Sequence, residues 1–209
     1  MTLTEPTRRE RKKDETRRRI FDAAIGLFRE KGFEQTTVDE ITEKADVGRG
    51  TFFNHFHRKE AVLAYLSEER LGEAEENVAH LLESRDSMRA KLQAIYRIAS
   101  QAHEEDRELA RFVFAEWMKR AFAPTQDADA RWQKLLCAAL AQGRGRGEMR
   151  DDVDDARAES ILSAIYFATV YQWLFCPEGA EGAIPDFAAE LRARLDVAID
   201  GLEPRKGGR

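Results

Sequence analysis

Apolar residues recur at helical spacing through most of the chain, and breaks in this pattern divide it into segments. Ala, Leu, Glu, Arg and Gln dominate and clusters of β-branched residues are scarce, which favours helix over strand. The breaks predict helices at about residues 59–83, 87–104, 106–122, 127–143, 154–175 and 185–202. With three shorter segments nearer the N-terminus, the pattern predicts an all-α fold of about nine helices.

A short helix is expected from about residue 38, because two threonines stand just before it. Thr36 or Thr37 can cap this helix with its hydroxyl, and Glu40 lies three residues after Thr37, which is the spacing of a capping box. Ile41 and Ala45 follow at helical spacing. One face of the helix is therefore expected to be buried, while its acidic residues face water.

The residues that follow have the order of a helix-turn-helix. Asp46 is expected to close the first helix, because a tight turn needs positive φ and Asp is among the few residues besides Gly that tolerate it. Val47 can then fill the space between the helices. A second helix over about residues 49–55 is apolar on one side through Phe52 and Phe56. The outer face of such a helix can enter the DNA major groove.

The outer face of residues 49–55 carries side chains that suit base recognition. Arg49 can bind guanine through two hydrogen bonds, Asn54 can bind adenine likewise, and Thr51 can contact a thymine methyl group. Lys59, at the start of the next helix, can bind a phosphate. The expected DNA-binding residues are Arg17, Thr36, Thr37, Gly48, Arg49, Gly50, Thr51, Phe53, Asn54, His55 and Lys59.

This segment resembles the DNA-binding domain of the tetracycline-repressor (TetR) family of bacterial transcriptional regulators, over about residues 17–66. Upstream, the similarity rests on Arg19-Ile20-Phe21-Asp22-Ala23-Ala24, Leu27-Phe28 and Lys31-Gly32-Phe33. The chain departs from the family pattern at Asp46, where Gly is usual, at Gly48, where Ser or Ala is common, and at Phe53, where Tyr commonly offers a hydroxyl to a phosphate. The resemblance implies a dimeric repressor that binds a palindromic operator in double-stranded DNA and is released by a small, mostly apolar or aromatic ligand.

Charge is distributed unevenly along the chain. The net charge is -5, yet residues 1–59 carry 14 Lys and Arg against 11 Asp and Glu, so the acidic excess lies in the remainder. This division is compatible with DNA binding by the basic part. We expect a basic arm at 1–13, which either contacts phosphates and a minor groove or is a solvated tail. After the arm we expect a DNA-binding domain at 14–58, a ligand-binding and dimerisation domain at 59–202, and a C-terminal tail at 203–209.

Aromatic side chains gather in the distal part of the chain. The resemblance implies a ligand pocket there, and pockets for apolar ligands are lined by such residues with a few polar groups that fix orientation. Ordinary helical cores have the same composition, so both interpretations stay open. The expected ligand-binding residues are Tyr96, Phe114, Trp117, Met118, Trp132, Cys137, Tyr166, Thr169, Val170 and Trp173.

The last two predicted helices carry extensive apolar surface. The helix at 185–202 has a stripe of leucines, and the helix before it is apolar nearly all round, which requires burial on several sides. The resemblance implies that both helices pair with their copies in a second subunit, so that two reading helices meet a palindrome. The expected interface residues of this homodimer are Ile161, Ile165, Gln172, Leu191, Leu195, Ala198 and Leu202.

The sequence offers little for catalysis, and no cofactor, metal site or catalytic residue is expected. The Glu-x-x-His pairs of di-iron helical bundles do not occur. The glycines within 143–147 follow a helix rather than a strand, so they do not match a dinucleotide-binding loop. No apolar run is long enough for a membrane span and no signal peptide is evident, so a cytoplasmic protein without membrane contact is expected.

Two other functions are open on the sequence alone. One is a small-molecule-binding or enzymatic helical bundle with a vestigial DNA-binding head, which the intact outer face from Arg49 to His55 disfavours. The other is a regulator that is switched by a protein partner or by oxidation of Cys137 or Cys176. These cysteines form no C-x-x-C pair, and buried cysteines usually behave as small apolar residues.

Overall fold

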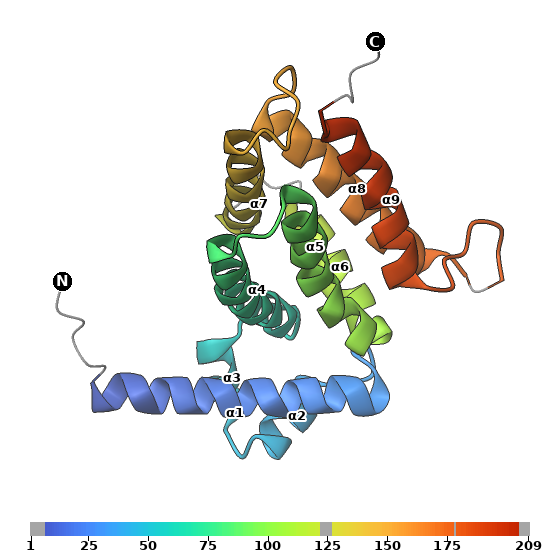
Figure 1. The fold of residues 1–209 in the computed structure, drawn as a ribbon. Coiled ribbons are helices and arrows are strands. Elements are labelled where there is room, and N and C mark those ends of the chain that lie inside the picture. The colour runs from blue at the N-terminus through green and yellow to red at the C-terminus, as the bar shows by residue number, and fades with distance from the viewer. Residues whose placement is uncertain (1–6, 122–126, 178, 205–209) are drawn as a thin grey trace, which may run out of the picture. The chain divides into compact units, whose positions relative to one another are not determined.

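The structure is a computed structural model that describes residues 7–121, 127–177 and 179–204. Within this part of the chain there are nine helices and no strand, which confirms the expected all-α class (Figure 1). The helices are α1 (Arg8–Lys31), α2 (Val38–Lys44), α3 (Arg49–His55), α4 (Glu60–Glu83), α5 (Met88–Glu105), α6 (Arg107–Ala121), α7 (Asp127–Gly145), α8 (Asp155–Phe175) and α9 (Phe187–Leu202).

From α2 onward, the helix ends lie within about two residues of those expected from the sequence. Capping side chains account for several of them. Ser87, Asp154 and Asp186 each accept a hydrogen bond from the backbone N–H three residues later, at the start of α5, α8 and α9. These contacts are local in sequence, which is why the sequence alone located the helix starts.

Helix α1 extends further toward the N-terminus than the apolar pattern suggested. It begins at Arg8 because Thr7 and Glu10 form a capping box, in which the Glu10 N–H donates to the Thr7 hydroxyl (3.3 Å) and the Thr7 N–H donates to the Glu10 carboxylate (2.7 Å). Residues 8–19 have no apolar stripe, so their helical period was invisible. Residues 8–13 of the expected arm are therefore the exposed first turns of α1, and residues 1–6 lie outside the described residues.

The chain divides into two compact units, and the first contains the described residues up to Ser67 together with the α6 segment Phe112–Lys119. The Phe33 ring contacts the Phe112 ring, with 5.1 Å between their centroids. The buried Glu116 carboxylate accepts a hydrogen bond from the Arg58 guanidinium (2.9 Å). A segment of α6 is thus packed and paired within the same unit as α1, α2 and α3.

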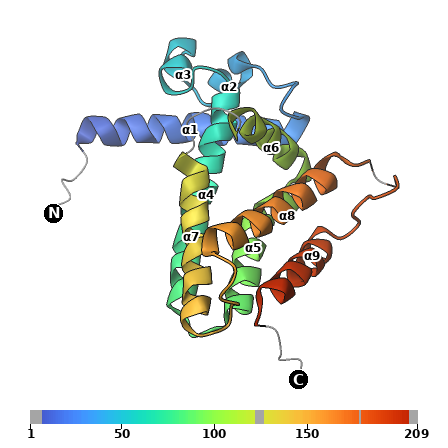
Figure 2. The same ribbon diagram turned by 90° about the horizontal axis from the view of Figure 1, so that it is seen from above.

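The second unit contains Glu68–Arg111 and the chain from Arg120 onward. Within it α8 and α9 lie side by side (Figure 1, Figure 2), and α5 packs against α7 and α9. Among the described residues, no helix is long and apolar enough to cross a membrane. The largest fully buried side chains of this unit include Met88, Lys91, Leu92, Ile95, Tyr96, Leu136 and Leu140.

Candidate functional site

The helix-turn-helix forms as the local sequence predicts. The Thr37 hydroxyl accepts a hydrogen bond from the Glu40 N–H (3.3 Å), and the Glu40 carboxylate accepts one from the Thr37 N–H (2.8 Å), so the expected capping box is confirmed. Asp46 has φ of 50°, which is the positive value expected for the turn. Phe52 and Phe56 are buried beneath α3. This packing fixes the outer face of α3 as the exposed one.

The exposed face of α3 presents most of the expected base-reading residues to solvent. Gly48, Arg49, Gly50, Phe53 and Asn54 are exposed, while Thr51 and His55 are half-buried. The Arg49 guanidinium donates to both carboxylate oxygens of Asp39 (2.9 and 3.2 Å) and lies over the Phe53 ring at 5.9 Å. An exposed ion pair of this kind contributes little free energy, so Arg49 can exchange Asp39 for a base or a phosphate at low cost.

Arg17 of α1 lies beside the C-terminal end of α3. Its guanidinium is placed over the Phe56 ring (5.7 Å) and the Tyr65 ring (5.0 Å). Burial lowers the pKa of His55, and the positive charges of Arg17 and Lys13 lower it further. The lowered pKa favours the neutral form of His55, and Arg17 of α1 supplies positive charge at this end of α3.

Thr36 does not fit the expected role in DNA binding. Its side chain is 1% exposed, and its hydroxyl donates a hydrogen bond to the Gly32 carbonyl oxygen (2.9 Å). The side chain therefore anchors the loop between α1 and α2 instead of facing solvent. The adjacent Thr37 is exposed and fills the capping position, so the sequence could not tell the two threonines apart.

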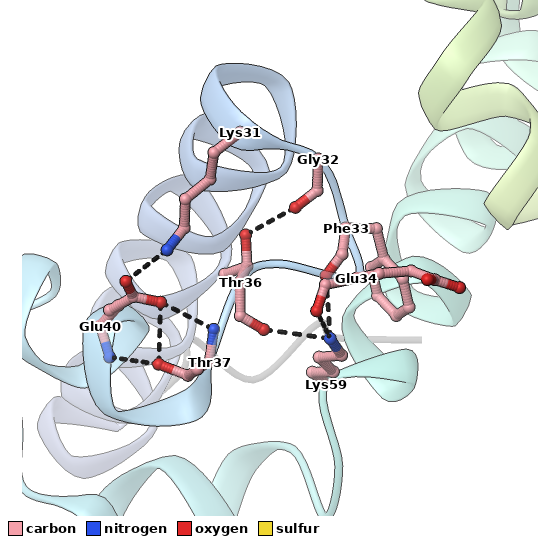
Figure 3. A network of polar contacts seen from close by, with 8 residues as sticks. All are labelled: Lys31, Gly32, Phe33, Glu34, Thr36, Thr37, Glu40 and Lys59. Atoms are coloured by element: carbon pink, nitrogen blue, oxygen red, sulfur yellow. Dashed lines mark hydrogen bonds and ion pairs between the residues drawn. The ribbon is translucent and has the colours of Figure 1, made fainter.

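Lys59 also differs from its expected role as a phosphate clamp. Its ammonium donates to the carbonyl oxygens of Phe33 (2.8 Å), Thr36 (3.0 Å) and Glu34 (3.1 Å), and it lies 4.5 Å from the centroid of the Phe33 ring (Figure 3). An ammonium has three donors, so all of them are used within the protein. Lys59 closes the loop between α1 and α2, and no donor is left over for a phosphate.

We expect Lys59→Met to lower the free energy of unfolding by about 2–3 kcal/mol, because three carbonyl groups lose a charged donor. Urea unfolding measures this loss, with Lys44→Met as the control, since the interaction of Lys44 within the described part of the chain is a surface pair with Glu30. In DNA titrations of the folded variant, the dependence of log Kd on log salt concentration should stay unchanged. A slope smaller by about one would instead show that Lys59 neutralises a phosphate.

The expected ligand-binding residues are divided between the two units. Phe114, Trp117 and Met118 belong to the first unit, and the other seven belong to the second. In the second unit the Tyr96 and Tyr166 rings lie 5.4 Å apart, and the Trp173 ring stacks on Phe187 at 4.8 Å. Thr169 and Val170 are fully buried; the Thr169 hydroxyl donates to the Ile165 carbonyl oxygen (2.7 Å). Contact between these ten residues and a ligand therefore stays a prediction.

His103 forms a buried contact that the sequence interpretation missed. Its Nε2 lies 3.0 Å from the Tyr166 hydroxyl, and that hydroxyl donates to the Ala99 carbonyl oxygen (3.1 Å). Nε2 must therefore carry the proton, while Nδ1 is buried without a hydrogen-bond partner among the described residues. The sequence could have predicted this contact from spacing, because His103 lies seven residues after Tyr96 and therefore on the same face of α5.

Burial, with a smaller contribution from the Arg70 charge, lowers the pKa of His103 to about 4 from the ordinary value of 6.5. Between these values the unfolded chain binds more protons than the folded protein, so stability falls as the pH falls through this window. We expect a loss of about 2 kcal/mol between pH 7 and pH 5 from this group. Urea unfolding of His103→Gln at both pH values should lack that loss, whereas the exposed control His80→Gln should retain it. An unchanged loss in His103→Gln would assign the pH dependence to other groups.

The expected dimer face requires correction. Leu191, Leu195 and Leu202 are buried within the second unit's own core, at 5% exposure or less. Gln172 donates to the Gly182 carbonyl oxygen (2.5 Å), and Ile165 and Ala198 are half-buried. An apolar helix has inner and outer apolar faces that sequence periodicity does not distinguish, and the leucine stripe is the inner one.

The outer apolar face of α8 and α9 is different. Of the expected set, only Ile161 is exposed, at 47%. Tyr171 at 56% and Val197 at 75% are the other large exposed apolar side chains of this pair of helices. Exposed alanines continue the same stripes. We define the α8/α9 outer face by Ile161, Ala164, Ala168, Tyr171, Ala193 and Val197.

Comparison with known proteins agrees with this arrangement. A family model described as bacterial regulatory proteins, tetR family, matches residues 20–66. The crystal structure of FadR from Thermus thermophilus, described as a TetR family transcriptional repressor in complex with lauroyl-CoA, is 30% identical, covers 92% of this chain and 98% of its own, and has a TM-score of 0.73. The HTH-type transcriptional regulator TtgR of Pseudomonas putida is 28% identical over 200 residues, which are 90% of this chain and 91% of that relative.

The capped α2, the positive-φ turn and the exposed polar face of α3 define a helix-turn-helix DNA-binding protein. The relatives just described are transcriptional regulators. The chain belongs to the TetR family of ligand-responsive bacterial transcriptional regulators, which bind DNA operators as dimers.

Proposed function

We propose that this chain represses transcription by binding a palindromic operator as a homodimer, and that a small, mostly apolar ligand releases it. The exposed face of α3 carries this proposal, because Arg49 and Asn54 stand on it with the donors that read guanine and adenine. Gly48 and Gly50, also exposed, let the backbone approach DNA closely. Arg17 and Thr37 flank this face and are candidates for phosphate contacts.

The α8/α9 outer face is the surface we assign to dimerisation. Exposed apolar residues on adjacent helices are costly in water, and a twofold axis through this face would bury the stripe of each protomer against its copy. Two α3 helices related by that axis would then meet two half-sites of opposite orientation. This assignment replaces the leucine stripe, which is already occupied inside each protomer.

Release requires that the ligand bind the DNA-free state more tightly than the DNA-bound state. The second unit is the candidate effector unit because it holds most of the aromatic residues expected to contact ligand. An oxidation switch is less favoured, since burial, together with the charges of Glu159 and Asp155, raises the pKa of the Cys137 thiol. A raised pKa leaves less of the reactive thiolate at pH 7.

Selection from a random duplex library tests the proposal. The purified full chain is incubated with the library at about physiological salt, where nonspecific electrostatic binding is weak, and the retained duplexes are sequenced. We expect an enriched palindrome. Enrichment of a single unpaired half-site would contradict the dimer, and a retained pool without sequence preference would contradict sequence-specific repression.

A further inference from the structure

A buried carboxylate in the second unit has no part in DNA binding. Glu159 of α8 is 5% exposed, and its carboxylate accepts hydrogen bonds from the Gln133 side chain of α7 (3.1 Å) and from the Ser163 hydroxyl (2.6 Å). Both donors are neutral. Within the described part of the chain Glu159 forms no ion pair, so its charge is solvated by dipoles alone.

This arrangement is expensive for the folded protein. A carboxylate offers about four acceptor positions, and two of those on Glu159 are filled by described residues. A buried carboxylate without a counterion is unfavourable unless a cation or further donors reach it. An apolar residue at this position would avoid this unfavourable burial. The presence of a carboxylate therefore points to a ligand that brings a cation or hydrogen-bond donors to Glu159.

The Tyr96 hydroxyl is a second polar group at the same place. Tyr96 of α5 is 1% exposed, and its hydroxyl has no hydrogen-bond partner among the described residues. Burial raises the pKa of this phenol. The Tyr96 ring lies 5.4 Å from the ring of Tyr166, which stands one turn after Ser163 on α8, so Tyr96 lies near Ser163 and Glu159. The Ser163 proton is already given to Glu159, so Ser163 can accept a hydrogen bond from the Tyr96 hydroxyl but cannot donate one to it. The Tyr96 oxygen is therefore left without a donor among the described residues. Helices α5, α7 and α8 thus converge on one incompletely satisfied polar cluster.

Apolar side chains flank the cluster on each of the three helices. Leu92, Leu136 and Leu162 are fully buried, and each stands one turn from a member of the cluster on its own helix. A ligand that inserts between these buried side chains would therefore contact both apolar groups and a negatively charged end. That combination suits an amphipathic molecule and not a uniformly apolar one.

We propose that Glu159, Ser163 and the Tyr96 hydroxyl form the polar end of an effector site for ligands that carry a protonated amine on an apolar or aromatic body. The ammonium N–H groups donate to the Glu159 carboxylate and the Tyr96 oxygen, and the charge of the ligand compensates that of Glu159. The inference rests on the proposed function, in which the second unit binds the effector. It separates this chain from an acyl-CoA binder such as the Thermus relative, because an anionic head is repelled by Glu159.

The test compares three probes that share one body: 4-phenylbutylamine, 4-phenyl-1-butanol and 4-phenylbutyrate. Isothermal titration calorimetry with the full chain at pH 7 gives the Kd of each. We expect the amine to bind at least about tenfold more tightly than the alcohol, which lacks the charge-assisted bond, and the butyrate to bind most weakly.

Glu159→Gln keeps the shape of the side chain and removes its charge, so it should abolish the preference for the amine over the alcohol. The matched control Glu104→Gln, at an exposed position of α5, should retain the preference. Tyr96→Phe removes only the unpartnered hydroxyl and should weaken amine binding while leaving alcohol binding nearly unchanged. Thermal melting of each variant confirms that it is folded.

Equal affinities of wild type for the amine and the alcohol would overturn the inference, as would failure of all three probes to bind. Retention of the amine preference in Glu159→Gln would overturn it as well. Binding of the selected operator duplex is measured separately and without ligand. If the probe results contradict the amine site while the operator is still bound, the proposed repressor function stands. If the operator is not bound, the proposed function fails, whichever probes bind.

Discussion

Val197→Glu is expected to convert the protein to monomers and to weaken binding to a palindromic operator by at least about 100-fold. In a dimer, binding of one subunit to its half-site raises the effective concentration of the other subunit at the second half-site, and a monomer lacks this gain. Val197 is 75% exposed on the α8/α9 outer face. The charge therefore costs little in an isolated protomer but would lie buried and unpaired in the proposed dimer. Light scattering after gel filtration measures the mass, and fluorescence anisotropy with labelled duplex measures Kd.

Ala141→Glu is the matched control, since it adds the same charge at an exposed alanine of α7. It should leave both the dimer and operator affinity intact. A Val197→Glu protein that is still dimeric would place the interface elsewhere. Melting temperatures of both variants close to wild type would show that the loss of affinity does not come from unfolding.

Asn54→Ala should cost about 1–3 kcal/mol per half-site at the preferred operator and much less on random DNA, because the amide would lose a base contact and not a phosphate contact. Asn54 is exposed on α3, as is Arg49, for which the same loss is expected. Competition titrations with operator and random duplexes measure the two affinities in one experiment.

The control for this substitution is Asn77→Ala, which removes an exposed amide from α4 in the second unit. It should change neither affinity. If Asn54→Ala weakened operator and random duplexes equally, Asn54 would be a phosphate contact, and base reading would rest on Arg49 and Thr51.

Features that depend on neighbours close in sequence could be predicted. Thr37 and Glu40 form the capping box that their spacing indicated, and Asp46 has the positive φ that a tight turn demands. The helix ends from α2 onward follow from such local signals. The capping box of Thr7 and Glu10 was equally local, but the absence of apolar periodicity after it hid the start of α1.

Features that depend on contacts distant in sequence could not be predicted. The position of Lys59 in the sequence suits a phosphate contact. In the structure its ammonium instead donates to carbonyl oxygens of the loop at Phe33, which is 26 residues away in the chain. The stripe of Leu191 and Leu195 is as apolar as an interface, and only packing shows that it faces inward. Glu159 looks like one more polar position on a helix, because periodicity does not reveal which polar residues three converging helices enclose.

The participation of an α6 segment in the first unit limits how this protein can be recombined with its relatives. A chimera that exchanges only the residues up to Ser67 would separate Arg58 from the buried carboxylate of Glu116, and Phe33 from Phe112. The purpose of such a hybrid would be to give the effector unit a new operator. For this chain, the exchanged part must include Phe112–Lys119 or an equally matched segment. The DNA-binding unit is therefore one compact unit that is encoded by two separate stretches of the gene.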